Sequence, residues 1–258
     1  MSDVGVAVVV EDDTDMRHLL AGVLGQAGFE VHTAHDGRTG VEMVRDRQPS
    51  VVTLDVGMPD IDGFEALRRI RQFSDAYVLM LTGRTAESDI LTALQAGADD
   101  YIAKPIRPRE VRARIAALLR RPRSGHSSGS QVVSRPEPSS GASQREESVL
   151  RHNGLSLDHR MRTVDVGGVG LDLTRSEFDL LHELLRSAGA VRSRRQLVGT
   201  LRGRFSPGGY ISEADERAVE VHIGNLRRKL GDDPQSPRWL QTVRGVGYCL
   251  ARKRSGDT

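Results

Sequence analysis

Two apolar segments of the chain carry carboxylates at their ends. The pair Glu11-Asp12 follows the run VAVVV, and Asp55 is the last residue of the run VVTLD. A charged carboxylate at the end of a buried strand costs free energy unless it is paired, hydrogen-bonded or bound to a metal. Magnesium prefers oxygen ligands and needs only one or two protein carboxylates. We expect Asp12 and Asp55 to bind Mg²⁺ directly, Glu11 through water, and Gly57 through its carbonyl.

A hydroxyl and an ammonium group occupy equivalent places further along the chain. Thr82 ends the run YVLMLT, and Lys104 follows DYIA and precedes a proline. A metal would offset the repulsion among the acids and leave one oxygen of Asp55 free to attack phosphorus. Lys104 and the Thr82 hydroxyl would then pair with the phosphoryl oxygens. Taken singly, each signal is also typical of a solvated loop, but together they indicate an aspartyl-phosphate site.

The apolar pattern of residues 1–121 places these groups at one edge of a sheet. Strands are expected at 6–10, 29–34, 51–55, 77–82 and 100–104, and helices at 16–28, 37–47, 64–72, 87–98 and 108–121. Five such units with continuous apolar strands predict an α/β domain with a parallel sheet covered by helices on both faces. In such sheets the ligand site lies beyond the carboxyl ends of the strands.

Composition divides the chain into two domains and a linker. Residues 1–121 carry 15 Lys and Arg against 19 Asp and Glu, whereas residues 148–254 carry 19 against 12. Between them, residues 122–147 are rich in Ser, Gly and Pro and have no apolar period, as in a flexible linker. An acidic half joined to a basic half suggests two tasks, with nucleic acid the candidate partner of the basic half.

The basic half has the pattern of a small α+β domain. Short strands are expected at 155–158, 163–166 and 169–173, and a hairpin at 242–250. Capping boxes at Thr174 to Glu177 and at Ser193 to Gln196 each precede an apolar helical run. A third helix covers ERAVEVHIGNLRRKLG. Three helices followed by a hairpin predict a winged helix-turn-helix.

Candidate DNA contacts cluster on the third helix and the hairpin. A helix in the major groove needs cations for phosphates and amide or guanidinium groups for base edges, and a wing reaches the adjacent groove or backbone. We expect the third helix to turn these residues away from its apolar face: Arg217, His222, Asn225, Arg227 and Arg228. Arg244 and Tyr248 of the hairpin are the further candidates. The alternative is a solvated basic helix with no partner.

Several function classes are excluded or disfavoured. No apolar run approaches the length of a membrane span, and the N-terminus MSDVGVAVVVEDD lacks the basic region of a secretory signal. Cys249 is the only cysteine of the 258 residues, which excludes an intrachain disulfide. We therefore expect a cytoplasmic protein with no membrane partner.

The motifs VVVEDD, LDVGMPDIDG, MLTGR and AGADDYIAKPI resemble, in order, the receiver domain of two-component response regulators over residues 5–121. The resemblance implies a flavodoxin-like (CheY-like) fold and phosphorylation of Asp55 by a sensor histidine kinase. It also implies Mg²⁺ held at Glu11 and Asp12, and a switch pair formed by Thr82 and Tyr101. TRSEFDLLHELL, ERAVEVHIGNLRRKLGDDP and TVRGVGY look like the OmpR/PhoB-type effector domain over 150–252, which implies binding to double-stranded promoter DNA.

That family dimerises through the fourth helix, fifth strand and fifth helix of the receiver. Charged residues are available for such a homodimer here: Asp99, Asp100, Glu110, Arg112, Arg114 and Arg120. The sequence departs from the family at Ile90 and Thr92, where basic residues are common, and Glu110 is therefore expected to lack its usual partner. The C2 dimer remains the expectation, with Ile90 adding apolar area.

The third helix departs from the family as well. Ala218 lacks a hydroxyl that commonly touches phosphate, and Gly224-Asn225 replaces two basic residues. Arg202 stands where tryptophan is frequent and is expected to take a phosphate contact. These changes predict an altered base preference, with adenine read by Asn225.

Two other interpretations compete with a phosphorylation-controlled regulator that is not a dedicated enzyme. A hydrolase of the haloacid-dehalogenase kind also uses an aspartate nucleophile, but it expects D-x-D and a cap domain. Here the residue two beyond Asp55 is Gly57, and no cap is visible. A phosphate-independent dimerisation module is the third possibility, against which the intact set of Asp55, Thr82 and Lys104 argues.

Overall fold

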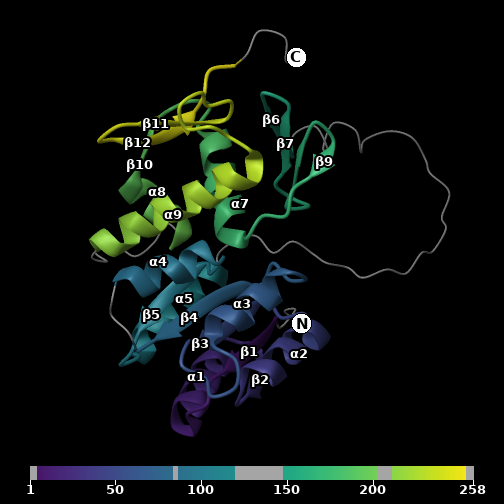
Figure 1. Ribbon diagram of the computed structural model, residues 1–258, viewed down its shortest axis with the longest axis vertical. Coiled ribbons are helices and arrows are strands. Elements are labelled where there is room, and N and C mark those ends of the chain that lie inside the picture. The colour runs from purple at the N-terminus through teal and green to yellow at the C-terminus, as the bar shows by residue number, and fades with distance from the viewer. Residues whose placement is uncertain (1–4, 84–86, 120–147, 203–210, 254–258) are drawn as a thin grey trace, which may run out of the picture.

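The computed structural model describes residues 5–83, 87–119, 148–202 and 211–253. These residues form two domains that lie one above the other in Figure 1. The predicted linker at 122–147 lies outside the described residues. Within the described ranges, every helix is too short or too polar to cross a membrane.

The N-terminal domain alternates strands and helices, as its apolar pattern predicts. Its strands are β1 (Val6–Val10), β2 (Glu30–Ala34), β3 (Val51–Asp55), β4 (Tyr77–Thr82) and β5 (Asp100–Ala103). Its helices are α1 (Thr14–Gln26), α2 (Gly37–Arg47), α3 (Gly63–Arg71), α4 (Glu87–Gln95) and α5 (Pro108–Leu119). The strands form one parallel sheet in the order β2-β1-β3-β4-β5, which confirms the predicted flavodoxin-like fold.

Both faces of this sheet are buried. Side chains alternate along a strand, so Val8 and Val10 pack with α2, α3 and α4, while Ala7 and Val9 pack with α1 and α5. All five residues of β3, including Asp55, are buried. Because apolar side chains fill both faces, polar chemistry is confined to the ends of the strands.

Three aspartates at this edge start the helices that follow the strands. Asp13, Asp36 and Asp62 each occupy an N-cap and accept a backbone N–H bond of 2.8, 2.8 and 2.7 Å, respectively. Such caps supply acceptors for the first N–H groups of a helix, which have no partner within it. They fix where α1, α2 and α3 begin relative to β1, β2 and β3.

The C-terminal domain is a winged helix, as predicted. Its helices are α7 (Arg175–Arg186), α8 (Arg194–Leu201) and α9 (Glu213–Leu230). A four-stranded sheet comprises β6 (Val149–His152), β7 (Leu155–Asp158), β8 (Thr163–Val166) and β9 (Val169–Gly170). A three-stranded sheet comprises β10 (Arg192–Ser193), β12 (Gly247–Leu250) and β11 (Leu240–Val243). β6 and β10 were not predicted, because a four-residue strand of mixed polarity and a two-residue strand carry no apolar period.

Capping explains the helix starts of this domain. The predicted boxes at Thr174 and Ser193 are both present. A third box at Ser212 uses Asp215 where the motif expects Glu or Gln, and α9 therefore begins three residues earlier than the sequence pattern indicated. The apolar faces of the three helices meet Leu155, Trp239 and Leu240 in one core.

The two domains touch through helices that are far apart in the sequence. In Figure 1, α9 forms the lower border of the C-terminal domain and lies against α4 of the N-terminal domain. Ala218 of α9 belongs to the apolar cluster of the N-terminal domain and not to the core of its own.

Candidate functional site

Asp55, Glu11 and Lys104 meet at the carboxyl edge of the parallel sheet. Lys104 Nζ lies 3.0 Å from Asp55 Oδ1 and 2.9 Å from Glu11 Oε1. The carboxylates are buried, whereas the Lys104 side chain is 27% exposed. Burial raises the pKa of Glu11, while the hydrogen bond from Lys104 lowers it and the charge of Asp55 raises it. Burial lowers the pKa of Lys104, but its bonds to both carboxylates outweigh that effect and raise it.

The three acids fit a hard cation. Ligand atoms of Glu11, Asp12 and Asp55 all lie within 4.8 Å of one another. Glu11 Oε2 is buried and has no hydrogen-bond partner among the described residues, although buried polar atoms are nearly always satisfied. A divalent ion with its waters would satisfy this atom and offset the surplus negative charge. The acidic cluster expected from the sequence is therefore present and can hold a metal.

Three further predicted site residues lie on β4, on β5 and in the loop after β3. Thr82 is buried at the end of β4, and its carbonyl accepts the backbone N–H of Lys104 at 2.7 Å. A Cβ added to Gly57 would lie 3.6 Å from Asp55 Oδ2, which places that residue beside the carboxylate. Tyr101 is buried on β5, and burial together with the charge of Asp215 raises its pKa to about 12.

Two residues that were not singled out from the sequence support the loop after Asp55. Asp60 accepts the backbone N–H groups of Gly37 and Arg38, both at 2.9 Å, and so caps the neighbouring helix α2. Gly63, at the start of α3, packs directly against the backbone of Asp55. Both residues stand in the quoted run DVGMPDIDG, but only the folded loop shows what they contact.

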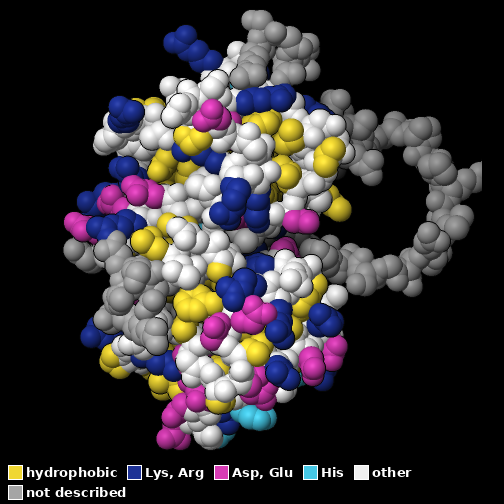
Figure 2. All heavy atoms as spheres, viewed as in Figure 1, with side chains coloured by type: hydrophobic (Ala, Val, Ile, Leu, Met, Phe, Trp, Pro, Cys, Tyr) yellow, Lys and Arg dark blue, Asp and Glu magenta, His cyan; other side chains and the backbone are white. Residues whose placement is uncertain are grey.

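The candidate DNA-binding arginines fall into two groups. Arg244, in the hairpin turn, is exposed, and Arg217, on α9, is partly exposed and lies 3.8 Å from Glu213 of the same helix. Arg227 instead donates to Leu240 O and Thr242 Oγ1, both at 2.8 Å, and so fastens α9 to the hairpin. Arg202 forms an ion pair with Asp215, so its guanidinium is engaged within the domain. On the face shown in Figure 2, basic side chains of this domain are interspersed with acidic ones.

Three further DNA candidates are buried. Tyr248 is 5% exposed and packs in the core of the winged helix, so the expectation that its ring faces a groove is not met. His222 and Asn225 are 1% and 4% exposed. They do point away from the core of their own domain, but they face the N-terminal domain and not solvent. Arg228 donates to Asn225 Oδ1 at 3.0 Å.

The charged residues expected to link two copies of the N-terminal domain are paired within the chain. Arg114 binds Asp100 at 2.5 Å and Glu110 at 2.9 Å, which gives Glu110 a partner on its own helix. Arg112 donates to Gln26. Asp99 is buried. Arg120 lies outside the described residues.

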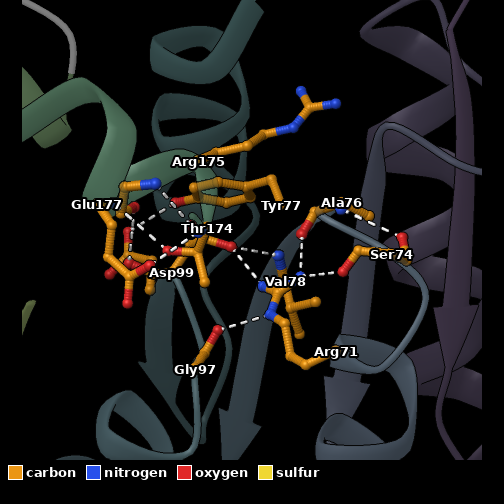
Figure 3. Close-up of polar contacts among 12 residues, drawn as sticks. Arg71, Ser74, Ala76, Tyr77, Val78, Gly97, Asp99, Thr174, Arg175 and Glu177 are labelled. Atoms are coloured by element: carbon orange, nitrogen blue, oxygen red, sulfur yellow. Dashed lines mark hydrogen bonds and ion pairs between the residues drawn. The ribbon is translucent and has the colours of Figure 1, made fainter. Parts of the chain in front are cut away.

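Sequence reasoning also missed the partners of Asp99. Arg71 donates to its carboxylate at 2.6 Å and to the carbonyls of Gly97 and Ala76, as Figure 3 shows. Ser176, at the start of α7, donates its backbone N–H to the same carboxylate at 2.9 Å. The sequence does not distinguish Arg71 from the other arginines of α3, because the partners that make it different lie on other elements.

Comparison with known proteins agrees with this architecture. Residues 7–116 match the family described as response regulator receiver domain, and residues 168–250 match transcriptional regulatory protein, C terminal. The chain is 36% identical over 243 residues to the probable transcriptional regulator ycf27 of Cyanophora paradoxa, covering 94% of this chain and 95% of that one. It is 36% identical over 244 residues to the transcriptional regulatory protein AfsQ1 of Streptomyces coelicolor, covering 94% and 96%.

A solved structure shares the fold of both domains. The C128S mutant of RitR superposes with a TM-score of 0.70 at 22% identity, covering 96% of this chain and 99% of that chain. The chain therefore belongs to the OmpR/PhoB-type response regulators, phosphorylation-dependent transcription regulators that join a receiver domain to a winged-helix DNA-binding domain.

Proposed function

We propose that Asp55 accepts a phosphoryl group from a sensor histidine kinase and thereby controls binding of promoter DNA by the effector domain. The observation that carries this proposal is the position of Asp55. Its Oδ1 lies 3.0 Å from Lys104 Nζ, and the ligand atoms of Asp55, Glu11 and Asp12 lie within 4.8 Å of one another. One carboxylate oxygen of Asp55 attacks phosphorus, and the bond from phosphorus to the donor's imidazole nitrogen breaks. Lys104 then moves its charge from the carboxylates to the new phosphoryl oxygens.

Mg²⁺ is the proposed cofactor, held by Glu11, Asp12, Asp55 and the carbonyl of Gly57. When bound, it neutralises the carboxylates and the charge that develops on the phosphoryl oxygens. Glu11 is held in place by its bond to Lys104. Thr82 lies at the end of the neighbouring strand β4, where its hydroxyl would bind a phosphoryl oxygen and link the reaction to Tyr101 on β5.

DNA is the proposed partner of the effector domain. The guanidinium groups of Arg244, which is exposed, and Arg217, which is partly exposed, are suited to phosphate contacts. A homodimer through α4, β5 and α5 would then place two effector domains on adjacent half-sites. We propose that the protein acts in the cytoplasm and is a phosphoacceptor rather than a dedicated enzyme; any loss of the phosphoryl group would be slow self-hydrolysis.

Labelling with a small phosphodonor tests this function. Acetyl phosphate with Mg²⁺ should place one acid-labile phosphate on the wild-type chain, and Asp55→Asn should abolish it. Asp46→Asn is the matched control, because Asp46 is an exposed residue of α2. Labelling that persists in Asp55→Asn would overturn the assignment, and rapid steady release of phosphate would favour a hydrolase.

A further inference from the structure

The loop between β1 and α1 contains two of the proposed metal ligands, and a single arginine near the start of α1 binds its backbone. Arg17 Nη1 donates to the carbonyl oxygen of Glu11 at 2.8 Å and to that of Asp12 at 3.0 Å. The backbone N–H of Arg17 donates to the carbonyl oxygen of Asp13 at 2.9 Å. Three successive carbonyls of the loop therefore accept hydrogen bonds from one residue.

The guanidinium of Arg17 is itself held in one orientation. Its Nη2 donates to Thr14 Oγ1 at 3.1 Å, and the side chain is partly buried. The helix from which it extends is fixed at its start, because Asp13 Oδ1 accepts the backbone N–H of Met16 at 2.8 Å. A guanidinium is planar and its donors have a fixed geometry, so bonds from both Nη atoms define its position. Arg17 is therefore a rigid support for the loop.

The bond from Arg17 completes the fixation of Glu11. The backbone N–H of Glu11 donates to Ala34 O at 3.1 Å, where β2 ends, and its Oε1 accepts from Lys104 at 2.9 Å. With the N–H, the carbonyl and one carboxylate oxygen all bonded, little freedom is left to the second oxygen, Oε2. Oε2 is the buried atom that has no hydrogen-bond partner in the described part of the chain. Arg17 thus helps to hold this free oxygen in place for a cation.

Asp12 depends on Arg17 more strongly, because its side chain is exposed. Within the described ranges, its carboxylate has no hydrogen-bond or ion-pair partner, and its carbonyl is bound by Arg17. The position of this carboxylate beside Glu11 and Asp55 is therefore set by the backbone of the loop. Ordering a loose loop when a metal binds would cost conformational entropy. A loop that is already ordered avoids that cost.

We propose that Arg17 is a positioning residue for the metal site, which orders Glu11 and Asp12 in advance and so raises the affinity for a divalent cation. The inference rests on the proposed Mg²⁺ site and extends it to a residue that does not touch the metal. Charge alone predicts the opposite effect, since a guanidinium repels a nearby cation and its removal should strengthen metal binding. The direction of the change in affinity therefore distinguishes positioning from charge.

Binding of Mn²⁺ to the full-length chain without a phosphodonor tests this role. Mn²⁺ takes the same oxygen ligands as Mg²⁺, and its free concentration is measured by electron paramagnetic resonance. Arg17→Met removes the guanidinium and should raise the dissociation constant about tenfold, as is usual when a residue that supports a metal ligand is lost. Arg17→Lys restores the charge without the planar donor geometry and should also bind Mn²⁺ more weakly than the wild type.

Arg112→Met is the matched control, because Arg112 is an exposed arginine that donates to Gln26 at the other end of α1. It should bind Mn²⁺ as the wild type does. Arg17→Lys can still donate to one carbonyl, so it provides a folded variant if Arg17→Met unfolds. Labelling by acetyl phosphate gives a second readout: Arg17→Met should need more Mg²⁺ for half-maximal labelling of Asp55, and its rate should recover when Mg²⁺ is saturating.

The outcomes separate the role of Arg17 from the proposed function. Unchanged or stronger Mn²⁺ binding by Arg17→Met would overturn the positioning role, and so would wild-type affinity in Arg17→Lys, because charge would then suffice. Either result would leave Asp55 as the phosphoacceptor. A wild-type chain that binds no Mn²⁺ would instead overturn the metal site, and the role of Arg17 with it.

Discussion

Gly63 packs against the backbone of Asp55 so closely that no side chain fits between them. A Cβ at Gly63 would overlap the carbonyl oxygen of Asp55 and lie 2.8 Å from the Cα of Val56. The glycine therefore lets the first turn of α3 lie directly against the start of the loop that follows Asp55.

Gly63→Ala should displace Asp55 and slow its labelling by acetyl phosphate. We expect a loss of about 1–3 kcal/mol in the free energy of unfolding, because an added methyl group in a packed site forces backbone shifts. Gly22→Ala is the control: nothing lies within 4 Å of its Cβ, and it lies inside α1. That change should stabilise the chain by about 0.5–1 kcal/mol and leave labelling intact. Equal labelling rates in the two variants would refute the packing argument.

Arg71→Met should destabilise the receiver strongly. The side chains of Arg71 and Asp99 are 12% and 0% exposed, so the substitution leaves a buried carboxylate without its cation. We expect the free energy of unfolding in urea to fall by about 3 kcal/mol. Arg68→Met removes an exposed ion pair with Glu65 on the same helix and should cost less than about 1 kcal/mol. Similar losses for both variants would show that the Asp99 cluster contributes little.

Asp60→Asn should reveal a pH-dependent contribution to stability. A slight loss of solvation raises the pKa of Asp60, which is exposed, but the backbone N–H groups of Gly37, Ile61 and Arg38 outweigh that effect and lower the pKa to about 2. Because the folded pKa is lower than the unfolded value of about 4, the carboxylate stabilises the fold at neutral pH, and this contribution is lost as pH falls from about 4 towards 2.

Urea unfolding of both proteins between neutral and acidic pH measures this difference. The wild type should exceed Asp60→Asn by about 1 kcal/mol near neutral pH, the usual value of a helix cap. The gap should narrow in acid. A gap that is constant with pH would show that the carboxylate charge is not what stabilises the start of α2.

Arg244→Ala should weaken DNA binding under phosphorylating conditions and lower its salt dependence. A guanidinium that contacts phosphate releases about one counterion, so the slope of log affinity against log salt should decrease by about 1. Arg160→Ala, an exposed change in the turn between β7 and β8, should keep the wild-type slope. An unchanged slope for Arg244→Ala would remove the hairpin turn from the DNA-binding surface.

Most helices and strands of the receiver could be predicted, because each has a continuous or periodic run of apolar residues and the polar site residues directly follow the strands. β1, β3, β4 and α2 have the expected bounds, and Glu11, Asp55 and Lys104 meet where the strands end. The effector was predicted less completely, since β6 and β10 depend on pairing with strands that follow them in the chain and have no period of their own. The start of α9 was missed because Asp215 completes its capping box in place of a longer acid.

The sequence by itself determined which residues lie at the receiver's site. The apolar runs show where each strand ends, and the carboxyl ends of parallel strands meet at one edge of the sheet. Only the tertiary structure shows what His222 and Asn225 contact. Their spacing on α9 indicates only that they point away from the effector core, and that direction suits DNA and the receiver equally. Their contacts with Asp99 O and Leu94 O join residues more than a hundred positions apart in the chain. Such contacts depend on how the folded surfaces of the two domains fit together, and a local sequence pattern does not predict that fit.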